Sequence, residues 1–563
     1  MNPWDAKFLA ADALAADDRP HLLQTPQGAL LGITRRHGDR RIGVFKAIPY
    51  AAPPTGAARW RPPAPAAPWP GVRAALHYPP DCIQPPAMMP ADALWYQGPL
   101  LPESEDCLYL NVWTPADEET AGDTGRRPVI VWIHGGSFVS GSGSHHLYDG
   151  CALAAKDVVV VTINYRLGIL GLFAHPELTA ESPHGSSGNY AVADIIQALR
   201  WVRENIASFG GDPDCVTLAG ESSGAFLVSL VMGSPLSKGL IHRAIGQSGG
   251  MFYRTRRLRG APGGRPGAEE LGAAFASAVG ARSLADLRAI PARDLVNKAF
   301  EHIAHLDGAG FLMAVDGWIL PDFNPDIFDR GEQADIPVLA GFNTDECNSM
   351  ANFGQVPLIA PDAAAYRAQL ATTYGELADT VAAVYPDSDP LRSTLKAFDY
   401  ALFGYAAEQW CHSMRHVSSH AYLYHFGHRA PGAETRLPAP PDREADLGAF
   451  HSAEIGYAFG HIDDGACYAP NIPFGPIGEK ERAMSELMSD FWTSFARDGV
   501  PSSPRGPEWK SYSDAGRDYM QFGDGRATAS THLMPGAREL QQSIANAAWE
   551  REIGWTGGNP DLV

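Results

Sequence analysis

Short, nearly continuous runs of apolar residues recur along the chain. Unlike a strand with one face in water, they show no regular alternation with polar residues, so we expect both faces of each strand to be covered. The runs occupy residues 129–133, 158–163, 216–219, 336–340 and 421–426. This pattern predicts a sheet of buried, mainly parallel strands.

A helix is predicted between the second and third of these runs, over residues 189–206. Its apolar residues recur at helical spacing: Val192, Ile196, Leu199, Val202 and Ile206. Strand, helix and strand in succession form the unit from which parallel sheets are built. Residues 30–49 instead alternate between apolar and polar, which predicts antiparallel strands at one side of a mixed sheet.

Two long helical stretches, residues 269–307 and 363–416, separate the later strands. Long insertions of this kind usually lie over the mouth of a pocket. Length alone would allow three or four domains of about 150 residues each. We instead predict one domain over residues 1–563, with insertions at about 255–330 and 350–450.

The charge of the chain narrows the range of partners. Its formal net charge is −20, which repels nucleic acid and anionic lipid surfaces. No run of 18 apolar residues predicts a membrane span. The N-terminal residues lack the basic and apolar regions of a secretion signal, so a cytoplasmic location is expected, with a secreted mature form left open.

A pentapeptide that carries chemistry occurs twice in the chain. Residues 220–224 (GESSG) and residues 246–250 (GQSGG) both fit the pattern G-x-S-x-G. In a nucleophile elbow the glycines permit a sharp turn, and the serine at its apex presents its hydroxyl. The candidates are therefore Ser222 and Ser248.

Sequence context separates these two serines. Ser222 follows the strand at residues 216–219 and precedes an apolar helical run, which gives the strand–turn–helix order of an elbow. Ser248 also follows a short apolar run but leads into a loop. We predict that Ser222 is the nucleophile and that Ser248 is a buried, hydrogen-bonded serine near it.

A glycine-rich turn follows the strand at residues 129–133. Its sequence is HGGSF, residues 134–138. Glycines there let backbone N–H groups point at a ligand, and a developing oxyanion requires such preorganised donors. The N–H group of Ser223, the residue after the nucleophile, would be a further donor. A plain glycine turn is the alternative, which the downstream elbow disfavours.

Ten segments of the chain, taken together, resemble the type B carboxylesterases, the family of carboxylesterases, cholinesterases and bacterial para-nitrobenzyl esterases. The resemblance extends from about residue 28 to residue 520. The segments are IPYAAPPTGAARW (48–60), EDCLYLNVW (105–113), HGGSF (134–138), NYRLGILG (164–171), FGGDP (209–213), GESSGA (220–225), AIGQSGG (244–250), NTDE (343–346), GAFHSAEIGYAFG (448–460) and FWTSFARDG (491–499). The resemblance implies an α/β-hydrolase fold and hydrolysis of carboxylic esters.

The resemblance also implies a catalytic triad. Matched by position, its nucleophile is Ser222, its acid Glu346 and its base His451. The chain order serine, acid, histidine is the order expected of this fold. Asp345 is a rival for the acid, because residue types alone do not separate it from Glu346.

The same match by position implies that the oxyanion donors are the N–H groups of Gly136, Ser137 and Ser223. The family usually has alanine at the last of these positions, a change that a backbone donor tolerates. The resemblance further implies a disulfide between Cys82 and Cys107. Seven cysteines scattered over the chain do not by themselves form a disulfide framework.

Several further residues near these motifs are candidates for the site. Trp95, Tyr96 and Phe138 are expected to form apolar walls of the pocket, with ordinary burial as the alternative. Glu221, which adjoins the nucleophile, would tune the base or position water. Arg59–Glu105 and Arg166–Asp194 are interpreted as structural ion pairs.

His412, His416 and His420 are spaced four residues apart, as metal ligands on one face of a helix can be. No carboxylate or cysteine arrangement completes the site, so a polar helix face is the preferred interpretation. We expect neither a metal nor a cofactor.

The sequence thus predicts a serine esterase that hydrolyses small-molecule esters through an acyl-enzyme intermediate. A monomer or homodimer is expected. Two alternatives stay open: a non-catalytic binding protein on the same fold, and a hydrolase of amides or carbamates. The size of the preferred acyl and alcohol groups does not follow from the sequence.

Overall fold

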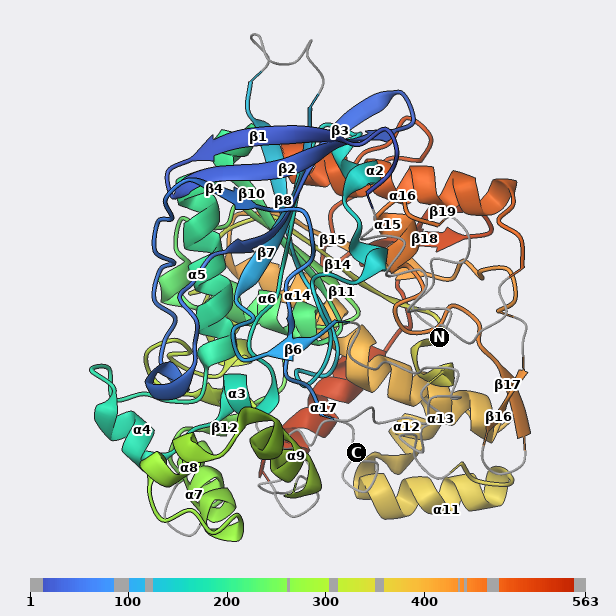
Figure 1. Ribbon diagram of the computed structural model, residues 1–563. Coiled ribbons are helices and arrows are strands. Elements are labelled where there is room, and N and C mark those ends of the chain that lie inside the picture. The colour runs from blue at the N-terminus through green and yellow to red at the C-terminus, as the bar shows by residue number, and fades with distance from the viewer. Residues whose placement is uncertain are drawn as a thin grey trace.

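A mixed sheet of 13 strands forms the centre of the protein (Figure 1). The computed structural model describes residues 14–85, 101–116, 125–260, 264–302, 312–349, 359–433, 436–439, 443–462 and 475–550. In spatial order the strands are β1 (Arg19–Thr25), β2 (Gly28–His37), β3 (Arg40–Pro49), β7 (Tyr109–Pro115), β9 (Val159–Ile163), β8 (Arg127–Ile133), β10 (Gly211–Glu221), β11 (Arg243–Gln247), β14 (Val338–Asn343), β15 (Ala421–Phe426), β18 (Asp518–Gly523) and β19 (Arg526–Thr531), with β4 (Val72–Ala74) beside β2.

The strands from β9 to β18 run parallel to one another, and the strands at both sides of them pair antiparallel, except that β4 runs parallel to β2. The predicted mainly parallel sheet with an antiparallel N-terminal side is therefore confirmed. Strand β14 begins at Val338, two residues later than predicted, because Pro337 has no N–H group to donate to a neighbouring strand.

Helices cover both faces of the sheet. In β8, Val129, Val131 and Ile133 belong to one apolar core, whereas Ile130 and Trp132 belong to another. This alternation follows from the two-residue period of a strand. The first core is shared with α5 (Tyr190–Asn205), α6 (Ser223–Gly233) and α14 (Tyr405–Ser413). The second is shared with α2 (Cys151–Ala154), α15 (Ile455–Ala458) and α16 (Glu479–Asp498).

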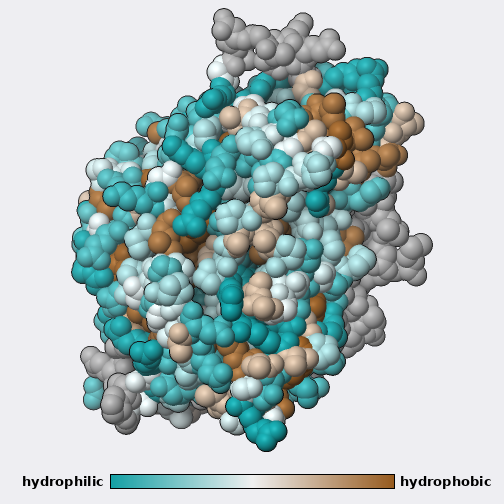
Figure 2. Space-filling view, turned by 60° about the vertical axis from the view of Figure 1, so that its left-hand side comes forward, coloured by the Kyte–Doolittle hydropathy of each residue, from teal (hydrophilic) through white to brown (hydrophobic). Residues whose placement is uncertain are grey.

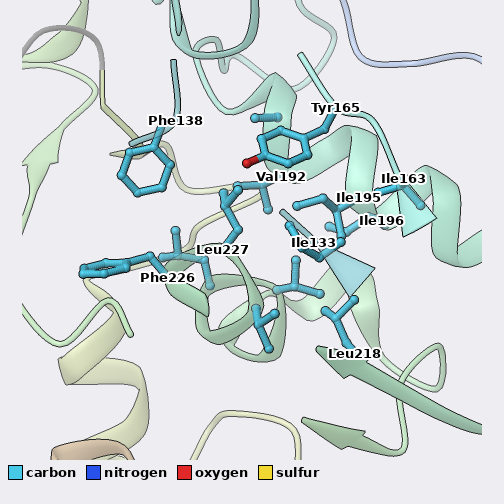
Figure 3. Close-up of a cluster of buried hydrophobic side chains, with 14 of the residues drawn as sticks. Ile133, Phe138, Ile163, Tyr165, Val192, Ile195, Ile196, Leu218, Phe226 and Leu227 are labelled. Atoms are coloured by element: carbon cyan, nitrogen blue, oxygen red, sulfur yellow. The ribbon is translucent and has the colours of Figure 1, made fainter. Parts of the chain in front are cut away.

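Helix α5 lies within one residue of the helix predicted at each end. Figure 3 shows Val192 and Ile195 from α5 beside Leu218 from β10 and Leu227 from α6. The same core contains Ile133 and Phe138, at the two ends of the glycine-rich turn, so the turn is anchored in the apolar cluster that also holds β10 and α6.

The two helical stretches predicted between later strands are also present. The first contains β12 (Arg256–Arg257), α7 (Ala268–Ala278), α8 (Leu284–Ala289), α9 (Ala292–His302), β13 (Ala314–Val315) and α10 (Asn324–Asp329). The second contains η7 (Glu346–Asn348), α11 (Ala363–Tyr374), η9 (Gly375–Leu377), α12 (Ala378–Val384), α13 (Pro390–Asp399), the π-helical turn η10 (Tyr400–Gly404), α14 and η11 (Met414–His416).

Helices from both stretches lie toward one end of the sheet, whereas α14 packs against its face. In Figure 1, α7–α9 appear at the lower left and α11–α13 at the lower right. The same end carries α3 (Gly168–Leu172) and α4 (Pro176–Glu181), which follow the carboxyl end of β9. These helices therefore gather near the carboxyl ends of the parallel strands. The division into one domain with two insertions stays a prediction.

The other elements are short or peripheral. They are η1 (Gly56–Ala58), β5 (Asp81–Cys82), β6 (Glu103–Ser104), η3 (His146–Tyr148), η4 (Ile206–Phe209), η5 (Pro235–Ser237), β16 (Arg436–Ala439), β17 (Arg443–Asp446) and α17 (Ala537–Glu550). Hydrophilic residues predominate on the face shown in Figure 2, with smaller hydrophobic patches between them. Within the described ranges, every helix is too short or too polar to cross a membrane.

Candidate active site

Ser222 stands between β10 and α6 on a backbone that L-residues rarely adopt. Its φ is 53° and its ψ is −129°. The N–H group of Ser222 donates to the carbonyl of Gln247 on β11 at 2.9 Å, which ties the turn to the neighbouring strand. A non-glycine residue at positive φ is strained and persists only where its surroundings impose it. The geometry is that of a nucleophile elbow.

The glycines around Ser222 are required by close packing. A Cβ atom on Gly224 would lie 2.1 Å from the carbonyl oxygen of Ile133, at the end of β8. A Cβ atom on Gly220 would lie 2.7 Å from the carbonyl carbon of Gly224. The elbow can therefore reach the end of β8 only with glycine at these positions.

The glycine-rich turn after β8 lies directly beside the elbow. A Cβ atom on Gly135 would be 3.0 Å from the Cβ of Ser222. The next three residues, Gly136, Ser137 and Phe138, have φ values of 112°, 55° and 65°. Three consecutive residues at positive φ fold the turn back sharply next to the serine.

The three predicted oxyanion donors are not engaged elsewhere. Within the described part of the chain, the N–H groups of Gly136, Ser137 and Ser223 donate no hydrogen bond. Ser223 is the first residue of α6, where N–H groups have no acceptor within the helix. These donors are thus available to an acceptor from outside the described residues.

Glu346 and His451 form a short hydrogen bond. His451 Nδ1 lies 2.6 Å from Glu346 Oε2. The other carboxylate oxygen, Oε1, accepts from the Ser248 hydroxyl at 2.6 Å and from the Asn343 N–H group at 2.7 Å. Glu346 is completely buried. These contacts fix the carboxylate, which in turn orients the imidazole and leaves Nε2 as its second reactive nitrogen.

Glu221 faces that second nitrogen. Its Oε1 lies 3.3 Å from His451 Nε2 and accepts from the Ser452 hydroxyl at 2.5 Å. Glu221 is also completely buried. The Ser222 hydroxyl has no hydrogen-bond partner among the residues described. Catalytic hydrogen bonds are often long or unformed in an empty site and tighten when substrate binds.

The carboxylates around His451 control its charge. Burial by itself would lower the pKa of His451, but the nearby charges of Glu221 and Glu346 outweigh it and raise the pKa above its ordinary value. For Glu221, burial has the opposite effect and raises the pKa, and the charge of His451 offsets this increase only in part. The two groups titrate as a pair, with the imidazolium favoured over a wider pH range than in water.

The rival residues occupy other places. Asp345 points away from His451 to Lys396 Nζ, 2.9 Å from its Oδ1. Ser248 donates to Glu346, as expected of a buried serine beside the site. His412 Nδ1 contacts Asp514 Oδ1 at 2.6 Å. In the described ranges, no three His, Cys, Asp or Glu side chains group closely enough to hold a metal ion.

The predicted pocket aromatics are only partly placed. Trp95 and Tyr96 lie outside the described residues. Phe138 is buried and meets Phe226 edge-on, with ring centroids 6.1 Å apart (Figure 3). Phe403, on the π-helical turn η10, stacks on His451 at 4.5 Å. Sequence reasoning missed Phe403, since nothing local connects it to the base, although π-helical turns are frequent at functional sites.

A second layer of buried polar groups was also missed. Glu454 accepts from Asn343 Nδ2 at 2.6 Å and from Gln247 Nε2 at 3.0 Å. Trp492 Nε1 donates to the same glutamine at 2.9 Å. Gln247 and Glu454 lie in the segments AIGQSGG and GAFHSAEIGYAFG, which carry the family resemblance. Membership of these segments was the signal that could have identified both residues.

The predicted structural ion pairs are confirmed. Arg59 Nε lies 2.6 Å from Glu105 Oε1, and Arg166 Nη2 lies 2.6 Å from Asp194 Oδ1.

Cys82 and Cys107 are buried free thiols in the structure. A hydrogen bond in which the Cys107 thiol donates to Cys82 is the main cause that raises the pKa of Cys107, so the two side chains are adjacent. The disulfide between them stays a prediction.

Comparison with known proteins decides the family. The model of the carboxylesterase family matches residues 19–539. The chain belongs to the carboxylesterase family. The fumonisin B1 esterase of Sphingopyxis macrogoltabida is 35% identical over 522 residues, which span 91% of this chain and 88% of that protein. Carboxylesterase 1C of Mus musculus is 33% identical, over 90% and 89% of the two chains.

A solved structure of PNB esterase has the same fold as this carboxylesterase. The TM-score is 0.74 at 31% identity, and the match covers 92% of this chain and 99% of that one. The predicted α/β-hydrolase fold is therefore confirmed. Membership of the family also confirms the predicted activity, hydrolysis of carboxylic esters in small molecules by a serine esterase.

Proposed function

We propose that this carboxylesterase cleaves esters with Ser222 as nucleophile, His451 as general base and Glu346 as the acid that orients the base. The 2.6 Å contact between His451 Nδ1 and Glu346 Oε2 is the main support. It fixes the tautomer that leaves Nε2 free to accept a proton. Ser222, on its left-handed elbow, is the nucleophile that the same site presents.

In the first half of the reaction, His451 Nε2 takes the proton of the Ser222 hydroxyl as Oγ attacks the ester carbonyl. The carbonyl oxygen becomes an oxyanion, which the N–H groups of Gly136, Ser137 and Ser223 stabilise. Each such donor contributes roughly 3 kcal/mol to lowering the barrier. The imidazolium then gives its proton to the alcohol as it leaves, and an acyl-enzyme remains.

In the second half, His451 activates water, which attacks the acyl-enzyme and releases the carboxylic acid. The imidazolium forms in each half-reaction, and Glu346 stabilises it both times. Glu221 lies 3.3 Å from the same ring and adds a second negative group. A positively charged imidazolium would be costly in a buried site, and the two carboxylates thus favour its formation.

The substitution Ser222→Ala tests this assignment on para-nitrophenyl esters from acetate to decanoate. We expect kcat to fall by at least about 10⁴-fold, because no other group can form the acyl-enzyme. A fluorophosphonate probe should label the wild type once, at Ser222, and leave the variant unlabelled. A Ser222→Ala enzyme with wild-type turnover would disprove the proposal.

Substrates that differ in one group at a time measure the size of the acyl pocket and test for amide or carbamate hydrolysis. The ester series reports the preferred acyl length, and an amide or carbamate with the same acyl group reports any preference for another bond. Fumonisin B1 is included because of the relative named for it. Monomer or homodimer, and a cytoplasmic location, stay predictions.

A further inference from the structure

A compact cluster of charged groups joins the second helical stretch to the loop that carries the proposed acid. Lys396, on α13, places its Nζ 2.9 Å from Asp345 Oδ1 and 3.2 Å from Asp399 Oδ2. The same Nζ also donates to the carbonyl of Thr344. One cation thereby bridges α13 and the end of β14.

These contacts lie on both sides of Glu346. Asp345 immediately precedes it, and Cys347 immediately follows it. The N–H group of Cys347 donates to Asp399 Oδ1 at 2.6 Å. Lys396 contacts Asp345 directly and holds Asp399, which in turn holds Cys347. The backbone that presents the Glu346 carboxylate is therefore attached to α13 at the residue before it and the residue after it.

Asp345 also connects the acid loop to the base loop. Its Oδ2 accepts from the Ala449 N–H group at 3.0 Å, and its own N–H group donates to the Ala449 carbonyl at 3.0 Å. Two residues further on, the His451 N–H group donates to the Glu346 carbonyl at 3.3 Å. A shift of Asp345 would thus move both members of the short hydrogen bond.

The balance of charge in this cluster depends on Lys396. Asp399 is buried, with a relative exposure of 2%, and burial raises its pKa to about 6. Burial would lower the pKa of Lys396, but the charges of Asp399 and Asp345 outweigh it and raise the pKa. Without this cation, the carboxylates of residues 345 and 399 would face each other uncompensated beside Glu346, a costly arrangement in a buried site.

We infer that Lys396 is a positioning residue for the reaction: it holds the backbone on both sides of Glu346 and thereby keeps the Glu346–His451 pair in register. This inference rests on the proposed triad. A misplacement of about 1 Å at a reacting group can cost on the order of 100-fold in rate. The residue itself touches no substrate, so its loss should slow the chemical steps and leave substrate binding nearly intact.

The substitution Lys396→Met tests the inference, with kcat expressed per active site after titration with a fluorophosphonate. Titration removes the effect of unfolded enzyme, so a purely structural role would leave kcat per site unchanged. We expect kcat per site to fall between about 10- and 100-fold, with KM for para-nitrophenyl acetate within about threefold of wild type. Lys396→Arg, which keeps the cation, should restore most of the rate.

Lys480→Met is the matched control, because Lys480 pairs with Asp524 at the exposed surface. If Lys396→Met yields no folded enzyme, the double variant Lys396→Met/Asp399→Asn removes one charge of each sign and keeps an acceptor for Cys347. It should still lose at least about fivefold in kcat per site. Wild-type kcat per site in either variant overturns the inference, whereas a wild type that the probe does not label at Ser222 overturns the triad instead.

Discussion

The two halves of the proposed site are held by different physical means. Ser222 and the oxyanion turn sit on the central strands, fixed by close backbone packing around glycines and by the apolar cluster that anchors the turn. Glu346, at the start of the short helical turn η7, and His451, in a turn, are fixed by hydrogen bonds and ion pairs with buried carboxylates. The nucleophile side therefore depends on shape, and the acid–base side on charge.

The difference has consequences for how each half fails. A packed backbone that is forced apart cannot accommodate the change locally, since interiors have few voids. A carboxylate that loses one hydrogen-bond donor keeps the others, so the loss of one donor shifts its position only slightly. Substitutions on the nucleophile side should thus have larger effects than comparable substitutions on the acid–base side.

Among substitutions that leave the proposed triad residues in place, the largest effect is expected for Gly224→Ala, which adds a single methyl group on the nucleophile side. That methyl would lie 2.1 Å from the Ile133 carbonyl oxygen, so the elbow and β8 must separate. We expect kcat/KM to fall on the order of 100-fold and the free energy of unfolding to fall by roughly 1–3 kcal/mol. Ester hydrolysis and denaturant unfolding measure the two quantities.

Gly125→Ala is the control for this substitution, because no atom lies within 4 Å of the added methyl group. It should leave both quantities at wild-type values. A Gly224→Ala enzyme as active as Gly125→Ala would show that the elbow tolerates displacement, and the contrast between the two halves would then be wrong.

A smaller effect is expected for Ser248→Ala on the acid–base side. The substitution removes one of two donors to Glu346 Oε1 and leaves the Asn343 N–H group in place. A hydrogen bond to a charged group contributes about 1.5–3 kcal/mol, and because the Asn343 donor remains we expect the lower end of that range, a fall in kcat of roughly 10-fold. Labelling of Ser222 by a fluorophosphonate should persist.

Ser494→Ala serves as its control, since among the described residues the Ser494 hydroxyl on α16 bonds only to backbone carbonyls and one backbone N–H group. It should keep the wild-type kcat. If Ser248→Ala instead abolished labelling, Ser248 would be the nucleophile, and the choice made between the two G-x-S-x-G matches would be reversed.

The same division explains what the sequence could predict. Buried strands and a glycine elbow are local in sequence, so apolar runs and a pentapeptide were enough to locate β8, β10 and Ser222. The polar contacts around Glu346 join distant segments: Lys396 and Asp345 are 51 residues apart. A lysine or a phenylalanine in a helical insertion has no sequence motif that links it to the site. Lys396 and Phe403 were therefore identified only from the structure.

The smallest change in maximal rate is expected for Glu221→Gln. This substitution removes the negative charge of the side chain and hardly changes its shape. As the proposed base, His451 must be neutral to accept a proton, and the negative charge of Glu221 favours the imidazolium. The wild-type kcat/KM should therefore rise with pH through a limb above the ordinary histidine pKa of about 6.5. Removal of that charge lowers the pKa of His451, so the limb should move down by about one pH unit, with the plateau within about threefold of wild type.

Profiles of kcat/KM from about pH 5 to 10 measure this shift. Glu376→Gln, at an exposed position on η9, loses the same charge and should leave the limb in place. A limb that stays fixed in Glu221→Gln would mean that Glu346 alone sets the charge of the base. A limb that moves upward would mean that Glu221 is neutral and acts as a hydrogen-bond donor, which would reverse the sign of its role on the acid–base side.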